Sequence, residues 1–124
     1  MIFDKNTVPQ RLSISNTKPI ITFTDKGEIR FNVHSRELFK VKDRVYFRFQ
    51  VIDGMLHCIA GNHPNAFHVK ANGSTHITHG PLVRNIIKAM NLKVEKVSFE
   101  VLPALEKRNE GFLQYPLTIF NTQP

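Results

Sequence analysis

Residues 20–51, IITFTDKGEIRFNVHSRELFKVKDRVYFRFQV, carry the clearest structural pattern of this sequence. Hydrophobic and polar side chains alternate on both sides of the turn Asp25-Lys26-Gly27, which is typical of two β-strands joined by a hairpin turn with glycine at the position that needs a positive φ. Asn32 can then cap a helix over residues 33–40, because its side-chain oxygen can accept a backbone N–H that has no partner inside the helix.

The clearest alternation follows this helix. Its hydrophobic set is Val45, Phe47, Phe49 and Val51, and its polar set is Arg44, Tyr46, Arg48 and Gln50. The two sets fall on opposite faces of a strand, because successive side chains of a strand point to opposite sides. In the helix, Leu38 and Phe39 are expected on the apolar side. The stretch therefore predicts strand, turn, strand, short helix, strand.

A similar pattern returns in residues 67–101. Gly73 follows Gly27 by 46 residues, and Val97 follows Val45 by 52, so the second copy carries about six more residues, which we place in a longer helix. That helix is expected over residues 81–90, with Pro81 in its first turn. Its hydrophobic stripe at helical spacing consists of Leu82, Val83, Ile86, Ile87 and Met90.

The two copies set the expected domain organisation. Each continues past a turn into a returning strand, residues 55–60 in the first copy and 112–120 in the second. We therefore expect a single domain, because neither copy is large enough to bury its own hydrophobic face. Its parts are an N-terminal arm (1–19), a first hairpin-helix-hairpin repeat (20–60), a linker (61–66) and a second repeat (67–120). The arm either lies along a sheet edge or is a flexible tail.

Many short strands and few helical residues predict a mainly β protein with two short helices. The expected architecture is a closed or nearly closed β-barrel, in which the two repeats are related by a pseudo-twofold axis. Pro116 lacks a backbone donor, so the last strand should lie at an edge of the sheet or contain a bulge.

Charge and composition limit the choice of partner. The 124 residues carry a formal net charge of +7, which favours a polyanionic partner, although a basic but inert surface has the same composition. The single Cys58 excludes an intrachain disulfide framework and suits a reducing compartment. No hydrophobic run approaches the length of a membrane span, so we expect a soluble, cytoplasmic protein without membrane contact.

Residues 24–32 (TDKGEIRFN) and 38–47 (LFKVKDRVYF) resemble the AbrB-like family of DNA-binding domains. The shared pattern is a Lys-Gly turn, an Ile-x-apolar strand, a short helix that ends in Leu, and an Asp-x-Val strand start. Asn32 stands where the family usually has proline, and Lys42 where it has glycine. The resemblance implies a swapped-hairpin β-barrel, normally made by two identical chains. In this chain the resemblance implies an intrachain version of that dimer, with the second copy supplying the other half.

The resemblance also implies DNA binding by a basic face, in which the turn and the strand after it approach DNA. These positions are Lys26 and Arg30 in the first copy and Asn72 and His76 in the second. Outward strand positions and the helices offer further phosphate ligands. The expected nucleic-acid-binding residues are Lys26, Arg30, Arg36, Arg44, Arg48, Lys70, His76 and Arg84.

Metal binding and catalysis have little support in the sequence. The potential ligands His57, Cys58, His63, His68, His76 and His79 lack the spacing of a zinc site, because adjacent His57 and Cys58 face opposite ways on a strand. No phosphate loop, paired acids or nucleophile with an orienting third group is present. We expect no catalytic residue, metal, cofactor or small-molecule substrate.

The leading hypothesis is a non-enzymatic DNA-binding protein, either a transcriptional regulator or a protein of a mobile element. The alternative is an interaction module on the same fold, which binds another protein or forms a homodimer without binding DNA. Asn72, in place of a turn lysine, favours the alternative, and the net charge favours DNA binding. An antitoxin role is disfavoured, because the sequence has no long tail after its last expected strand.

Overall fold

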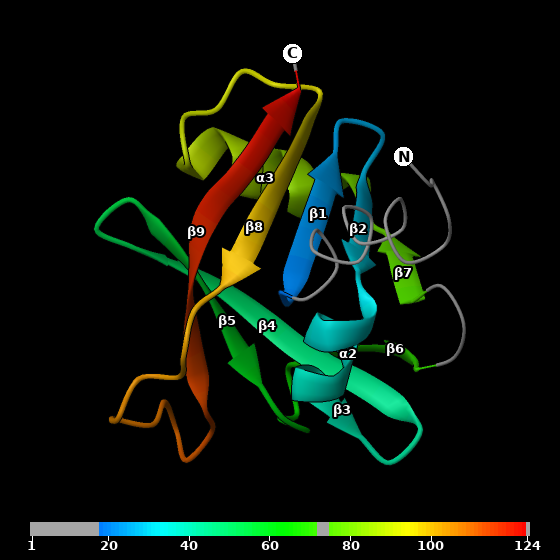
Figure 1. Ribbon diagram of the computed structural model, residues 1–124, viewed down its shortest axis with the longest axis vertical. Helices are drawn as coiled ribbons and strands as arrows, with labels where there is room; N and C mark the ends of the chain where they lie inside the picture. The colour runs from blue at the N-terminus through cyan, green and yellow to red at the C-terminus, as the bar shows by residue number, and fades with distance from the viewer. Residues whose placement is uncertain (1–17, 72–74, 124) are drawn as a thin grey trace, which may run out of the picture.

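The computed structural model describes residues 18–71 and 75–123, and half of these described residues are in strands. One curled antiparallel sheet forms a half-barrel, with two short helices packed against it (Figure 1). The elements are β1 (Ile20–Thr24), β2 (Glu28–Phe31), α2 (Val33–Phe39), β3 (Lys40–Val41), β4 (Arg44–Ile52), β5 (Met55–Ala60), β6 (Phe67–Lys70), β7 (Thr75–Thr78), α3 (Gly80–Ala89), β8 (Lys96–Val101) and β9 (Gln114–Gln123). The prediction of a mainly β protein with two short helices is confirmed.

The local signals of the first stretch act as expected. Gly27 has a φ of +89°, which completes the β1–β2 turn. Asn32 caps α2, because its Oδ1 accepts a hydrogen bond from the backbone N–H of Ser35 (2.9 Å). The same oxygen accepts from the N–H of Ile20 (3.0 Å), so the cap also ties the helix to β1.

The sheet is built by pairing between strands that are distant in the sequence. Its order is β3-β4-β5-β9-β8-β1-β2-β7, and β6 pairs with β4 on the side away from β5. Each strand of the early hairpins therefore has a neighbour from the later half of the chain: β1 pairs with β8, β2 with β7, β4 with β6 and β5 with β9. The sheet cannot form from either half alone.

The core lies on the concave side of the sheet. Alternate residues of β1, β2, β4 and β8 point inward, as the sequence pattern predicts. They are almost completely buried except at the end of β4, where Phe49 and Val51 are partly buried against the core. Their aromatic rings pack edge to face, for example Phe23 against Phe99 (5.6 Å between ring centroids). From the helices, Phe39, Val83 and Ile86 join the same core. The stripe predicted for α3 is thus confirmed.

One local expectation is wrong, and a second is met by only one of its two alternatives. Leu38 is 41% exposed, because the short helix α2 presents only one face to the sheet and Phe39 occupies it. The last strand is not at an edge, since β9 lies between β5 and β8. It does contain the predicted bulge, because its pairing with β8 shifts register between Ser98 and Phe99 and leaves one extra residue on β9. Pro116 is tolerated where β9 stops pairing with β5 and starts pairing with β8. Nearly all of the proposed N-terminal arm, and Asn72-Gly73 of the second turn, fall outside the described residues.

A polar pair is buried where β5 meets β9. Gln114 Nε2 donates to His57 Nδ1 (3.1 Å), which requires an unprotonated Nδ1. Both residues are less than a tenth exposed, and burial lowers the pKa of His57 below its ordinary value of 6.5. The folded protein therefore favours the neutral form of the His57 imidazole. Among the described residues, no helix is long and hydrophobic enough to cross a bilayer.

Replacing Gly27 by alanine should lower the free energy of unfolding by about 2–4 kcal/mol. A Cβ would be strained at this φ and would lie 2.7 Å from the Gly80 Cα, which is backbone and cannot swing away. Gly54→Ala is the matched control, because its φ is +78° but nothing lies within 4 Å of the added Cβ. Its cost should be about 1 kcal/mol. Equal losses for the two variants in urea unfolding would contradict the close-packing argument.

The buried histidine should make stability depend on pH. Because the pKa of His57 is lower in the folded than in the unfolded protein, its contribution is complete above about pH 6.5 and declines as the pH falls below that value. His57→Gln should flatten the dependence of the unfolding free energy on pH between about 7 and 5. Urea unfolding across this range measures the slope. An unchanged slope in the variant would show that His57 does not cause it.

Candidate nucleic-acid interface

Four strands place basic side chains on the convex side of the sheet. In β2, β7, β6 and β4, the residues that alternate with the inward-facing set point away from the core. Arg30 on β2 lies opposite His76 on β7, and Arg44 on β4 lies opposite Lys70 on β6. Strands β6 and β7 follow each other in the sequence and contact each other without pairing, which brings the two strand pairs next to one another. We call Arg30, Arg44, His68, Lys70 and His76 the paired basic face.

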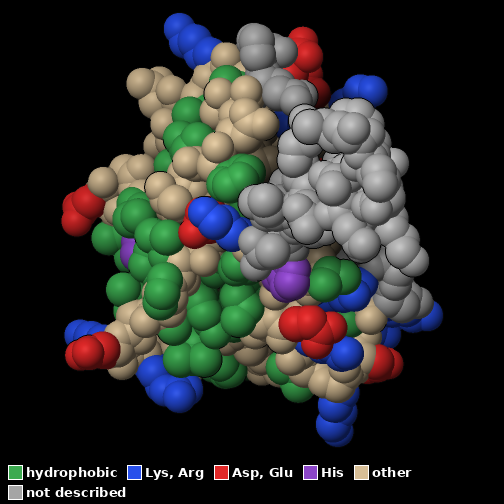
Figure 2. Space-filling model, in the orientation of Figure 1, with side chains coloured by type: hydrophobic (Ala, Val, Ile, Leu, Met, Phe, Trp, Pro, Cys, Tyr) green, Lys and Arg blue, Asp and Glu red, His purple; other side chains and the backbone are tan. Residues whose placement is uncertain are grey.

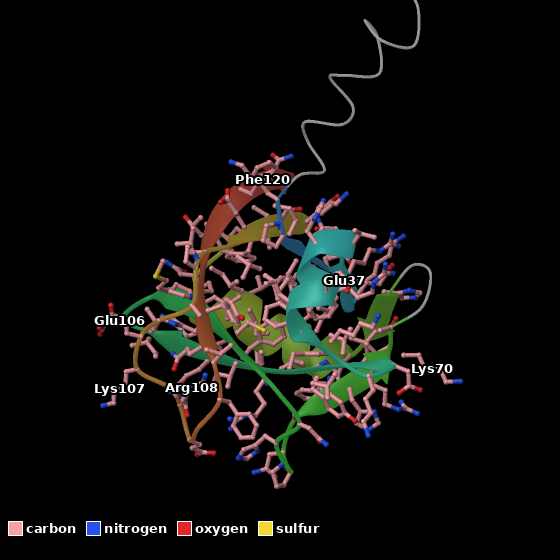
Figure 3. The ribbon with its side chains drawn as sticks, turned by 60° about the horizontal axis from the view of Figure 1, so that its bottom comes forward. Glu37, Lys70, Glu106, Lys107, Arg108 and Phe120 are labelled. Atoms are coloured by element: carbon pink, nitrogen blue, oxygen red, sulfur yellow. The ribbon has the colours of Figure 1, made fainter. Side chains whose placement is uncertain are left out.

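One end of this face is held by a local hydrogen bond. Arg44 Nη1 lies 3.2 Å from His68 Nδ1, which accepts from the guanidinium. The His68 ring packs against Tyr46, with 5.7 Å between ring centroids. Lys70 extends outward from the edge of the molecule (Figure 3) and makes no ion pair with a described residue. An oriented guanidinium beside an ammonium on a rigid strand pair suits phosphate contacts.

Arg30 is partly neutralised at the other end of the face. Its Nε and Nη2 donate to Glu28 Oε2 at 2.8 and 2.5 Å. The hydrogen bond from Arg30 is the main cause that lowers the pKa of Glu28, which therefore stays ionised. Arg30 remains more than half exposed. A phosphate would have to compete with Glu28 for this guanidinium.

Lys26 and Arg84 lie outside the strand pairs of the paired basic face. Lys26 is exposed in the β1–β2 turn, close enough to Glu28 for its charge to help lower the pKa of that carboxyl, as Arg30 and His76 also do. Lys26 therefore adjoins the Arg30 end of the face. The Arg84 guanidinium lies next to Gly80 at the start of α3, on which Gly27 of the same turn packs.

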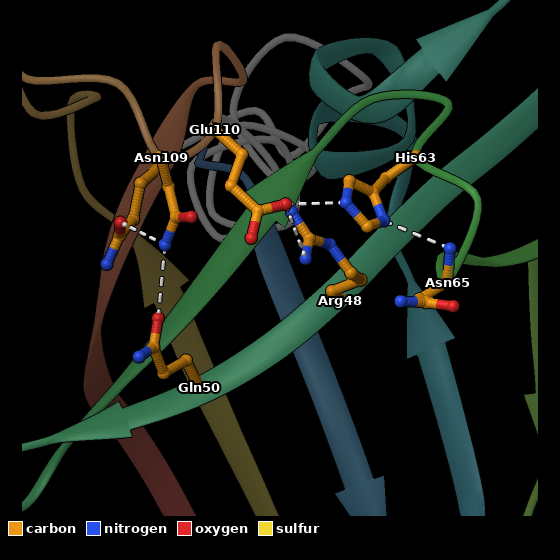
Figure 4. Close-up of polar contacts among 7 residues, drawn as sticks. Arg48, Gln50, His63, Asn65, Asn109 and Glu110 are labelled. Carbon is orange, nitrogen blue, oxygen red and sulfur yellow. Dashed lines mark hydrogen bonds and ion pairs between the residues drawn. The ribbon is translucent and has the colours of Figure 1, made fainter.

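Arg36 and Arg48 are engaged within the protein. The Arg36 side chain is 15% exposed and lies 4.0 Å from the Glu37 carboxylate. Arg48 is 18% exposed, and its Nη1 lies 3.7 Å from Glu110 Oε2 (Figure 4). Glu110 also contacts His63 Nε2 at 2.5 Å. The structure thus gives both arginines internal acidic neighbours, which reduces their availability to an external phosphate.

The segment 106–111 is fastened to the sheet by this cluster and by an amide network (Figure 4). Asn109 Nδ2 donates to Gln50 Oε1 (3.2 Å) and to Gln114 Oε1 (3.1 Å). The sequence predicts only a turn before the returning strand 112–120 and gives no sign of these contacts. Residues 48 and 110 are far apart in the sequence, and no spacing rule connects them.

Cys58 and the histidines of the described segments do not form a catalytic or metal site. Cys58 is fully buried, and burial raises the pKa of its thiol, so its sulfur is not a ready nucleophile. The described part of the chain contains no group of three or more His, Cys, Asp or Glu that could hold a metal ion.

No protein-family model matches the sequence, and comparison with curated proteins and with solved structures likewise found no match.

Proposed function

We propose that this protein is a non-enzymatic DNA-binding protein, built as a single-chain form of the AbrB-like swapped-hairpin barrel. The exchange of strands between the two halves supports the architectural part of this proposal. In this architecture, β1 of the first half would be equivalent to β6 of the second half. Strand β1 pairs with β8, which begins the second hairpin of the second half. Strand β6 pairs with β4, which begins the second hairpin of the first half. The pairs β2–β7 and β5–β9 would join equivalent strands across the axis.

The register of pairing agrees with the spacing of the two sequence copies. Thr24 pairs with Lys96. The residue 46 positions after Thr24 is Lys70, and the residue 52 positions before Lys96 is Arg44. Lys70 and Arg44 are also paired with each other. The position 46 residues after Arg30 is His76, its own partner across β2–β7. Equivalent registers are expected if a duplicated unit forms a pseudo-dimer.

The observation that carries the DNA-binding proposal is the paired basic face. Arg44 and Lys70 are neighbours on a paired strand segment, and Arg30 lies on the strand pair that continues the same convex surface. Because Arg36 and Arg48 have internal acidic neighbours, we expect roughly three phosphate contacts, with a slope of about −3 for log K against log salt. The biological role would be transcriptional control or a function of a mobile element.

Lys70→Glu should weaken binding to a fluorescent DNA duplex about tenfold in anisotropy titrations and reduce the salt slope by about 1, because it replaces a phosphate ligand by a repelling charge. Lys107→Glu is the matched control. It makes the same charge change at an exposed lysine on the opposite side of the molecule (Figure 3) and should alter the affinity by less than about twofold.

Glu28→Gln should act in the opposite direction and strengthen binding several-fold, because it removes a negative charge and releases Arg30. Equal effects of Lys70→Glu and Lys107→Glu would reject this face as the interface. Absence of salt-dependent duplex binding by the wild-type protein would overturn the DNA-binding proposal itself.

Self-association is a second candidate function, favoured by an exposed hydrophobic surface at the sheet end formed by β3. Val33, Leu38 and Val41 are 54%, 41% and 41% exposed. Leu38 and Val41 border a recess of about 200 Å³ that also includes Phe112. Hydrophobic side chains gather on the lower part of the face in Figure 2. A second copy could extend the sheet by pairing along β3.

Sedimentation equilibrium should show a concentration-dependent dimer if β3 is a self-association edge. Leu38→Glu should raise the dissociation constant at least tenfold, because it would bury a charge in the interface. Leu105→Glu is the control, since Leu105 is also 41% exposed but lies outside this surface. A monomer at all concentrations would exclude self-association.

A further inference from the structure

A groove lies between the β1–β2 turn, α3 and the segment that leads to β8. It has a volume of about 460 Å³, which is within the range of small-molecule sites. Its hydrophobic lining comes from Val83, Ile87, Leu92 and Val94. Val83 is buried and the other three are partly buried, so the groove has a preformed hydrophobic floor.

The charged groups of the groove are mostly cationic. Arg84, Lys88 and Lys93 line it together with one carboxylate, Asp25. All four are exposed, and none makes an ion pair with another described residue. Three cations beside a hydrophobic floor leave a positive excess that an anionic headgroup would balance. A hydrophobic ligand without charge would leave that excess uncompensated.

We propose that this groove binds a small amphipathic anion, a carboxylate with an aliphatic or aromatic tail. The tail packs on Val83, Ile87, Leu92 and Val94, and the carboxylate faces Arg84 and Lys88. Removal of the tail from water supplies the binding free energy, and the two cations select the sign of the headgroup. The site does not include the paired basic face and does not depend on DNA binding. The sequence predicted no small-molecule ligand, because the groove exists only after the turn packs on α3.

The test is a titration of the full chain with decanoate, below its micellar concentration, followed by backbone ¹H–¹⁵N NMR. Saturable shifts are expected for amides of α3 and residues 91–94. Decyltrimethylammonium, which has the same tail and the opposite charge, should bind at least tenfold more weakly. Saturable shifts confined to other parts of the chain, or equally tight binding of the cation, would overturn the proposal.

The double variant Arg84→Gln/Lys88→Gln should weaken decanoate binding at least tenfold. Lys107→Gln/Arg108→Gln is the matched control, because it removes two exposed cations that do not line this groove. Its decanoate affinity should stay within about twofold of wild type. Equal weakening by the two double variants would show only a general charge effect and would reject the groove. Ile87→Ser gives an independent check, since loss of the hydrophobic floor should also weaken binding.

Discussion

The constraint on which this structure depends is that strands from the first half of the chain complete their hydrogen bonding with strands from the second half. The β2–β7 and β5–β9 pairs join the halves directly, while β1–β8 and β4–β6 interleave them. An unpaired strand inside a sheet would leave backbone groups without partners, at a cost that neither half can avoid alone. The fully buried rings of Phe23, Phe47 and Phe99 then fill a core shared by both halves.

The same interleaving creates both proposed sites. Arg44 and Lys70 become neighbours only because β4 pairs with β6, and the groove beside α3 exists only because the β1–β2 turn packs on that helix. Convex strand positions carry the cations, whereas the concave positions are filled by aromatic and aliphatic side chains. Rigid strands hold their outward residues in a constant relative position, which is what repeated phosphate contacts require. The groove instead combines a helix with a turn and a loop, an arrangement more suited to a small ligand.

Some basic side chains contact acidic residues of the same chain, whereas others are open to solvent. Arg48 is half-buried beside Glu110, and its buried Nη2 has no hydrogen-bond partner among the described residues, whereas Lys70 extends into solvent. Arg30 lies between these cases, since Glu28 binds it but leaves much of it exposed. A net charge of +7 therefore overstates the positive potential at any one place. The polar cluster at 106–111 uses part of that charge to hold a loop against the sheet, with amide hydrogen bonds from Asn109 adding to the attachment.

The local elements can be predicted from the amino-acid sequence alone. Alternation around Gly27, the Asn32 cap and the hydrophobic stripe of α3 identify their strands and helices, because turn, cap and periodicity signals act over a few residues. The sequence also identified which side chains of β4 face outward. Long-range pairing sets three further features: Arg30 lies opposite His76, Arg48 contacts Glu110, and β9 is an interior strand despite Pro116. These outcomes depend on pairing between residues tens of positions apart, and local periodicity carries no information about the partner.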